Sequence, residues 1–79
     1  MRLSELAQGT DAVIQHVEDC ANSDPIARRL RDLGFVCGEA VRLVGRGPIG
    51  ADPLLVQVGY TRFALRKAEA ARVIVEQAP

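Results

Sequence analysis

Three side chains that could bind a metal ion stand two residues apart near the start of the chain. His16, Glu18 and Cys20 offer nitrogen, oxygen and sulfur donors, a mixed set that divalent transition metals accept. In an extended strand all three would point to the same side. Neighbouring side chains on one face of a strand are about 7 Å apart, however, and a structural zinc site normally has four ligands. The trio is therefore a weak candidate site for Fe²⁺ or Zn²⁺, and the alternative is an exposed histidine with an ordinary buried or half-buried cysteine.

The segment GRGPIG, residues 45–50, has the G-x-G-x-x-G spacing of a dinucleotide-binding turn. In that turn the glycines lead into a helix whose first amide groups hold a phosphate. Pro48 prevents a helix from starting here, and 79 residues are too few for the βαβ unit that surrounds the true motif. The sequence also has no G-x-x-x-x-G-K-[ST] segment. We therefore expect a plain glycine-rich loop that binds no nucleotide.

The loop expected over residues 46–53 is a candidate for contact with a protein partner. It would be long for a connection between two strands, and its prolines would present Ile49 in a preorganised position. A second candidate surface is the basic face of a predicted helix, where Arg28 and Arg29 point to solvent, although such charges are commonly a solvated surface and nothing more. The weak partner-binding candidates are Arg28, Arg29, Arg46, Pro48 and Ile49.

Catalytic chemistry has little support in the sequence. One histidine, two cysteines and isolated serines make no recognisable pair of nucleophile and base. A domain of this size also offers little of the enclosed cleft that catalysis uses. We assign no catalytic residue and no required cofactor, and we predict a protein that acts by binding rather than an enzyme.

Length and composition limit the chain to one small domain. Its 79 residues have room for one core, and no repeat or linker divides them, so we place a single domain over residues 1–79. Ten basic residues balance ten acidic ones, so no overall field would attract nucleic acid. The N-terminus has no apolar signal segment, and no stretch approaches the ~18 apolar residues of a membrane span. We therefore expect a cytoplasmic protein, as a monomer, whose two cysteines are free thiols.

One short helix is predicted within the segment SDPIARRLRDLGF. Asp24 is a suitable N-cap, Pro25 occupies the first helical position, and Gly34 is placed for the left-handed residue that ends a helix. Further on, RKAEAA is long enough for one helical turn only.

Short runs rich in β-branched residues predict five strands, two of them joined by the hairpin residues Gly59 and Tyr60. Ile14 and Val17 break strict alternation in the first run, which a bulge or burial on both faces would explain. Five short strands in so few residues can hardly form a two-layer sandwich. We therefore predict a mainly β fold, a small closed barrel with one short α-helix between the first and second strands. The predicted strands cover residues 12–18, 40–44, 54–58, 61–65 and 72–76.

Four segments occur in an order that is familiar from one protein family. They are LSELAQG, RRLRDLGFVCGEAVRLV, GPIGADPLLVQV and RFALRKAEAARVIV. Together they cover Leu3 to Val75, and the chain resembles the FeoA family, small cytosolic accessory proteins of bacterial ferrous iron uptake with an SH3-like barrel. It departs from the family pattern at Cys37, where the family usually has proline, and at Ala51, an extra residue in the proline loop.

The resemblance implies a function that the residues alone do not show. FeoA-like proteins are thought to assist FeoB, a large membrane iron transporter with a cytosolic GTP-binding domain, so the implied partner is the cytosolic part of a FeoB-like protein. A related SH3-like domain is also the last domain of iron-dependent repressors of the DtxR type. The alternative function is therefore a stand-alone, metal-responsive regulatory module. Copurification with a FeoB-like protein or with a DNA-binding regulator would distinguish the two.

Overall fold

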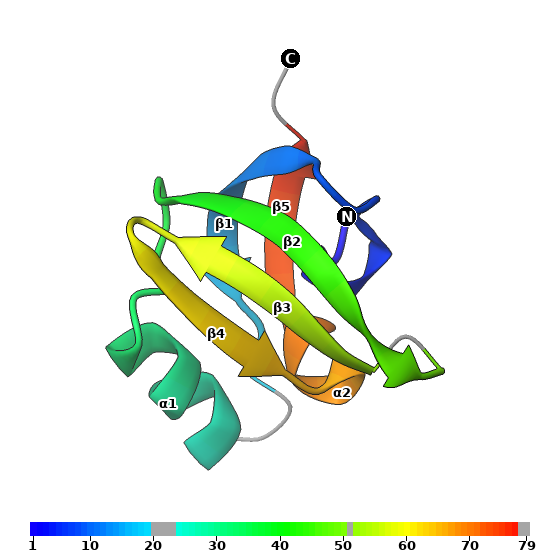
Figure 1. Ribbon diagram of the computed structural model, residues 1–79. Helices are drawn as coiled ribbons and strands as arrows, with labels where there is room; N and C mark the ends of the chain where they lie inside the picture. Colours follow the sequence, from blue (N-terminus) through cyan, green and yellow to red (C-terminus); the bar gives the residue numbers. More distant parts are fainter. Residues whose placement is uncertain (20–23, 51, 78–79) are drawn as a thin grey trace.

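The computed structural model describes residues 1–19, 24–50 and 52–77, and strands are its main regular elements. Five antiparallel strands form one curved sheet in the order β4-β3-β2-β1-β5 (Figure 1). A single helix of eight residues, α1 (Pro25–Asp32), lies between the first two strands in the sequence. The predicted mainly β fold with one inserted helix is confirmed. The strands are β1 Asp11–Val17, β2 Ala40–Ile49, β3 Asp52–Val58, β4 Thr61–Leu65 and β5 Val73–Gln77.

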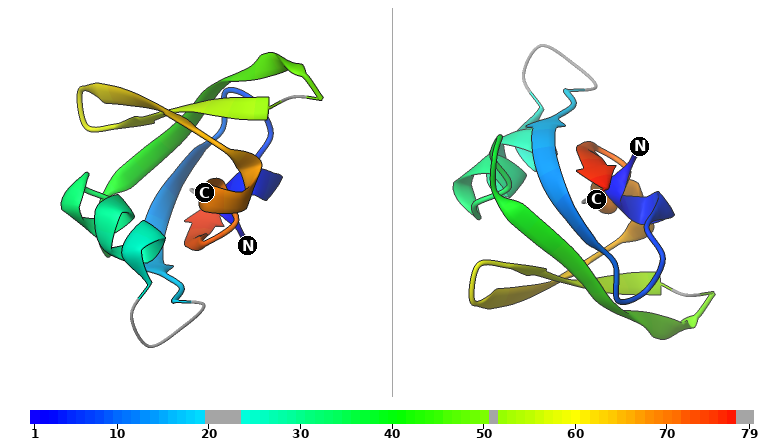
Figure 2. Two further views of the ribbon diagram at one scale, coloured as in Figure 1. Left: turned by 90° about the horizontal axis from the view of Figure 1, so that it is seen from below. Right: turned by 90° about the horizontal axis from the view of Figure 1, so that it is seen from above.

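The sheet curls around the core without closing. In the described residues the edge strands β4 and β5 do not pair with each other, so the prediction of a closed barrel is wrong in this respect. The reason is the four-residue helix α2 (Lys67–Ala70), the predicted helical turn, which stands between the two strands. Figure 2 shows α2 beside the 3-10 turn η1 (Leu3–Glu5) at this opening. Leu3, Leu6 and Ala70 are fully buried and fill it with apolar side chains.

The free edge of β5 is covered by the first residues of the chain. The α-amino group of Met1 donates to the carbonyl oxygen of Val75 at 3.1 Å, and the amide of Val75 donates to the carbonyl oxygen of Met1 at 2.8 Å. Arg2 continues this pairing with a bridge to Ile74. The N-terminal segment therefore satisfies backbone groups that would otherwise form an exposed edge.

Strand β1 contains an irregularity of the kind its sequence predicts. Ile14 and Val17 are both buried, and the register with β5 shifts between Ile14 and His16. A bulge at this point turns Val17 back towards the core. It leaves Gln15 and His16 exposed next to each other.

Helix α1 ends where the sequence predicts, at a left-handed glycine. Gly34 has a φ of 112°, and its amide donates to the carbonyl oxygen of Arg31 at 3.1 Å. The amide of Phe35 donates to the carbonyl oxygen of Leu30 at 3.0 Å. These two bonds form a Schellman motif, and both Leu30 and Phe35 are fully buried. Neither helix among the described residues is long and apolar enough to cross a membrane.

Strands β2 and β3 depart most from the sequence-based expectation. Expected over residues 40–44, β2 continues to Ile49, and β3 already begins at Asp52. The prediction of a loop over residues 46–53 is therefore wrong, because most of that segment belongs to the arms of a β-hairpin. The register between the two strands shifts twice in this part. Bulges let a strand accommodate glycine and proline, and they remove the regular alternation by which a strand is recognised.

We predict that Gly34→Ala lowers the stability of the fold by about 1 kcal/mol or more, because a residue with a Cβ is strained in this conformation. A Cβ at Gly34 would have Val58 Cγ1 as its nearest neighbour, at 3.9 Å, so the expected cost arises from the backbone and not from a clash. Thermal unfolding should show a midpoint lower by several degrees.

Gly45→Ala is the matched control for this substitution. Gly45 does not have a left-handed φ, and a Cβ there would meet no atom within 4 Å. Equal unfolding midpoints for Gly34→Ala and Gly45→Ala would contradict the assigned helix end.

Candidate functional site

The three metal-ligand candidates do not continue along one strand. His16 is exposed on β1, but this strand ends at Val17. Glu18 follows it and pairs with Arg2, with 3.2 Å between Oε1 and Nη1. Cys20 lies outside the described residues. Within the described ranges no group of three or more His, Cys, Asp or Glu side chains could hold a metal ion, and the site remains a prediction.

His16 instead shares a shallow groove with the other cysteine. The groove has a volume of about 190 Å³, and the exposed, free thiol of Cys37 stands with His16 among its lining residues. Cys37 belongs to the turn that leads into β2, and the pairing of this turn with β1 brings the two residues into one groove. Their spacing in the sequence carries no periodic signal, so sequence reasoning did not connect them. The groove is lined by Gln15, His16, Val17, Arg31, Phe35, Val36 and Cys37.

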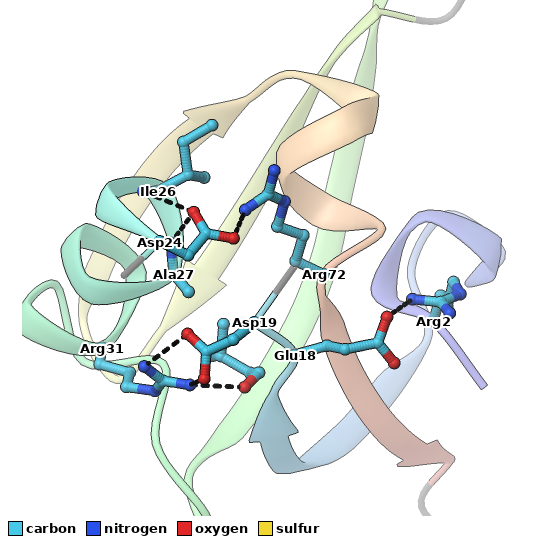
Figure 3. Close-up of polar contacts among 9 residues, drawn as sticks. Arg2, Glu18, Asp19, Asp24, Ile26, Ala27, Arg31 and Arg72 are labelled. Atoms are coloured by element: carbon cyan, nitrogen blue, oxygen red, sulfur yellow. Dashed lines mark hydrogen bonds and ion pairs between the residues drawn. The ribbon is translucent and has the colours of Figure 1, made fainter. Parts of the chain in front are cut away.

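The basic face predicted for α1 is partly neutralised by carboxylates. Arg31 Nη2 donates to Asp19 Oδ2 at 2.8 Å and to the carbonyl oxygen of Val17 at 2.7 Å (Figure 3). The hydrogen bond from Arg31 lowers the pKa of Asp19 below its usual value, and the same bond raises the pKa of Arg31. Arg29 forms an ion pair with Glu69 at 3.0 Å.

Arg28, on the same face of α1, has a charge that can still interact with another molecule. It is exposed, and no acidic side chain in the described part of the chain pairs with it. Of the two partner-binding candidates on α1, Arg28 is therefore the better placed to meet an acidic group on another protein.

A carboxylate at the start of α1 ties this helix to β5. Asp24 Oδ1 accepts hydrogen bonds from the amides of Ile26 at 3.0 Å and Ala27 at 3.3 Å, which confirms the predicted N-cap. Asp24 Oδ2 pairs with Arg72, and the Asp24 side chain is 5% exposed (Figure 3). The adjacent carboxylates of Glu18 and Asp19 point away from each other (Figure 3).

The partner-binding candidates on β2 have different surroundings. Arg46 Nη2 donates to the carbonyl oxygen of Leu6 at 2.7 Å and lies 3.5 Å from that of Ser4, so this guanidinium fixes the N-terminal segment to β2. Pro48 is exposed. The side chain of Ile49 lies outside what the structure describes.

An apolar groove that the sequence did not predict runs beside Pro48. It has a volume of about 330 Å³ and is lined by residues of β2, β3 and β4. Glycines at positions 45 and 47 leave it open on the β2 side. The sequence signal for such a groove is weak, because it depends on which residues of three strands stand next to each other. The lining residues are Gly45, Arg46, Gly47, Pro48, Pro53, Leu54, Leu55 and Ala64.

Comparison with known proteins gives the family of the chain. The family model for the FeoA domain matches residues 1–77. The chain belongs to the FeoA family. FeoA of Stenotrophomonas maltophilia, solved in complex with zinc, is 62% identical, with a TM-score of 0.89 over 96% of this chain and 89% of that one. That protein is described as a unique procaryotic SH3-domain protein and a candidate activating factor of bacterial ferrous iron transport. The SH3-like fold predicted from the sequence is thus confirmed.

More distant FeoA relatives differ in their overall length. A Porphyromonas gingivalis protein that fuses Fe(2+) transport protein A to the Fe(2+) transporter FeoB is 36% identical over 76 residues. The match covers 96% of this chain and 8% of the fusion protein. Iron(II) transport protein A of Clostridium thermocellum is 36% identical with a TM-score of 0.84, over 98% of this chain and 45% of that one. A manganese-dependent transcriptional repressor, 15% identical with a TM-score of 0.84, shares the fold.

The middle glycine of GRGPIG, Gly47, has a packing role in this structure. A Cβ on Gly47 would lie 2.6 Å from the carbonyl oxygen of Asp52 and 2.8 Å from Cδ of Pro53. Gly47 thus lets β2 and β3 approach each other closely. The close approach of the two hairpin strands therefore explains why the segment that resembles a dinucleotide motif has a glycine at position 47.

We predict that Gly47→Ala destabilises the fold by about 1–3 kcal/mol, because the added methyl group forces the backbone at Asp52 to move. Gly45→Ala in the same strand is the control and should unfold at nearly the parent's denaturant concentration. Urea unfolding of both variants is the measurement. A parent-like midpoint for Gly47→Ala would show that this hairpin opens at no cost.

Proposed function

We propose that the chain is a small accessory protein of ferrous iron uptake that binds the cytosolic part of a FeoB-like transporter. The observation that carries this proposal is the relative in which a FeoA-like sequence is fused to FeoB. A covalent link keeps two domains at high effective concentration, which is useful when the separate proteins must act together. In this proposal the chain works in the cytoplasm as a monomer, modulates the transporter and performs no catalytic step itself.

Two surfaces are the proposed contacts with the transporter. The first is the solvent side of α1, where Arg28, which pairs with no carboxylate of the described residues, stands beside Arg29. The second is the β2–β3 hairpin, where the exposed Pro48 borders the apolar groove, with Ile49 as the next residue. Arg46 contributes to the second surface indirectly, because it holds the N-terminal segment against β2.

An accessory protein can change a transporter only if it binds one conformation more tightly than another. The GTP-binding domain that the family resemblance implies for FeoB has such alternative conformations, set by its nucleotide. Binding of the chain to that domain should therefore depend on whether the domain is empty, GDP-bound or bound to a GTP analogue.

We predict a difference in affinity among these three forms of about 5- to 150-fold, the usual range of such coupling. The measurement is calorimetric titration of the purified chain onto the isolated cytosolic domain at one salt concentration. The chain titrated with GTP in the absence of the domain should give no heat of binding. Equal affinity for all three forms would exclude regulation through the nucleotide state, and no binding to any form would contradict the proposal itself.

Surface variants distinguish a specific contact from general charge attraction. Arg28→Glu should weaken binding to the domain, whereas Arg62→Glu makes the same charge change at an exposed position of β4 and should have a smaller effect. An equal loss of affinity in both variants would indicate attraction to the net charge and remove α1 from the proposed interface.

Transition metal binding is a second proposed property, favoured by the zinc complex of the Stenotrophomonas maltophilia relative. We propose weak binding of Fe²⁺ or Zn²⁺ through His16, with Glu18 and Cys20 as the further candidates from the sequence. Glu18 would have to share its carboxylate with Arg2. The metal is an added ligand and not a cofactor that folding requires. The alternative of a stand-alone metal-responsive regulator is supported by nothing beyond the fold shared with the repressor.

We predict that His16→Ala abolishes the heat of Zn²⁺ binding in a calorimetric titration, and that anaerobic Fe²⁺ behaves in the same way. Gln15→Ala is the matched control, because Gln15 precedes His16 in the same groove and does not belong to the preferred ligand types. An isotherm that is identical for His16→Ala and for the parent would exclude His16 as a ligand.

A further inference from the structure

The groove beside β1 combines two donor atoms that the sequence separates. His16 supplies an imidazole and Cys37 a thiol, and both side chains are exposed in the same groove. Nitrogen and sulfur together are the ligand pair typical of zinc and of other transition metals of intermediate softness. We infer that Cys37 is the sulfur ligand of the metal that His16 binds, an inference that rests on the metal binding proposed above.

The turn that carries Cys37 is held firmly against β1. The amide of Gly38 donates to the carbonyl oxygen of Ile14 at 2.8 Å, and the amide of Ile14 donates to the carbonyl oxygen of Glu39 at 2.9 Å. A third bond, from the amide of Glu39 to the carbonyl oxygen of Val36 at 3.2 Å, closes the turn itself. Cys37 therefore has a fixed backbone position beside the strand of His16, which lowers the entropy lost when a metal joins the two side chains.

The bulge in β1 places His16 at this groove. Because the register shifts between Ile14 and His16, Gln15 and His16 are both exposed, and Val17 returns to the core. The same irregularity that breaks the alternation of the strand thus turns the imidazole towards the Cys37 turn, where both line one groove.

The positive charge nearest to this groove is already compensated. Arg31 lines the groove, and its guanidinium is bound by Asp19 at 2.8 Å and by the carbonyl oxygen of Val17 at 2.7 Å. Repulsion between Arg31 and a bound cation is therefore offset by the Asp19 carboxylate. The acidic ligand candidate from the sequence, Glu18, is directed to Arg2 (Figure 3).

The number of protein ligands, two, determines how tightly this site binds a metal and which coordination positions stay open. A structural zinc site uses four protein ligands, so a site with one nitrogen and one sulfur leaves coordination positions to water or to a group from another molecule. Binding is accordingly weak and reversible. The inference concerns this chain, because it rests on the thiol of Cys37.

Cobalt(II) is a suitable probe, because a cysteine thiolate bound to it produces a sulfur-to-metal charge-transfer band in the near ultraviolet. The reduced full chain is titrated with Co²⁺ under argon, together with Cys37→Ser, Cys20→Ser, His16→Gln and Gln15→Ala. We expect the band in the parent, in Cys20→Ser and in Gln15→Ala. Cys37→Ser should lose it and bind about tenfold more weakly or worse, and His16→Gln should bind similarly weakly. Since Cys37 and His16 are exposed, both variants should unfold at the parent's temperature without metal.

The possible results separate the inference from the proposals on which it rests. A band that survives in Cys37→Ser, or one that disappears in Cys20→Ser, would overturn Cys37 as the sulfur ligand. Binding that depends on His16 but gives no charge-transfer band would also overturn Cys37 as the sulfur ligand, whereas His16 would remain a ligand. Absence of any Co²⁺ binding would overturn both this site and the metal proposal, whereas the transporter titration tests the accessory function independently.

Discussion

The open edge between β4 and β5 is the constraint on which most of this fold depends. A sheet of five short strands in 79 residues curls around one layer of side chains, and the crossing through α2 keeps its two edges apart. The N-terminal segment covers this open edge in two ways. Its first residues pair with β5, and Leu3 and Leu6 fill the opening from inside. Arg46 then holds the segment from the side of β2. The N-terminus, which looks like an unstructured lead-in, is thus an essential part of the core.

A second connection, through Asp24, joins the helix to the far end of the chain. One carboxylate oxygen caps α1 and the other meets Arg72, just before β5. This charge is nearly buried, so the ion pair with Arg72 offsets the cost of removing the Asp24 carboxylate from water. Together with the ion pair between Arg29 and Glu69, it fixes α1 relative to α2 and β5. Figure 2 accordingly shows α1 on one side of β1 and the α2–β5 segment on the other.

These structural contacts decide which polar residues remain for binding. Arg31, Arg46 and Arg72 are engaged within the fold, so the basic surface is smaller than the sequence indicates. Among the partner-binding candidates, Arg28 on α1 and Pro48, beside the apolar groove of the β2–β3 hairpin, remain exposed. In the proposed function, such a surface contacts the partner, and the chain acts through the difference in its affinity for two states of that partner.

The sequence by itself determined the elements whose signals are local. The N-cap at Asp24, the helix end at Gly34 and the hairpin at Gly59 each depend on a few consecutive residues, and the structure has all three. The family and its SH3-like fold were also evident from the order of segments along the chain. The end of the β2–β3 hairpin, over residues 46–53, was predicted as a loop, since its bulges at glycine and proline erase the alternation that marks a strand. Tertiary structure alone decided the open sheet edge, the engaged arginines and the groove shared by His16 and Cys37. These features depend on which distant residues the strand pairing brings together, and no local pattern of side chains encodes that.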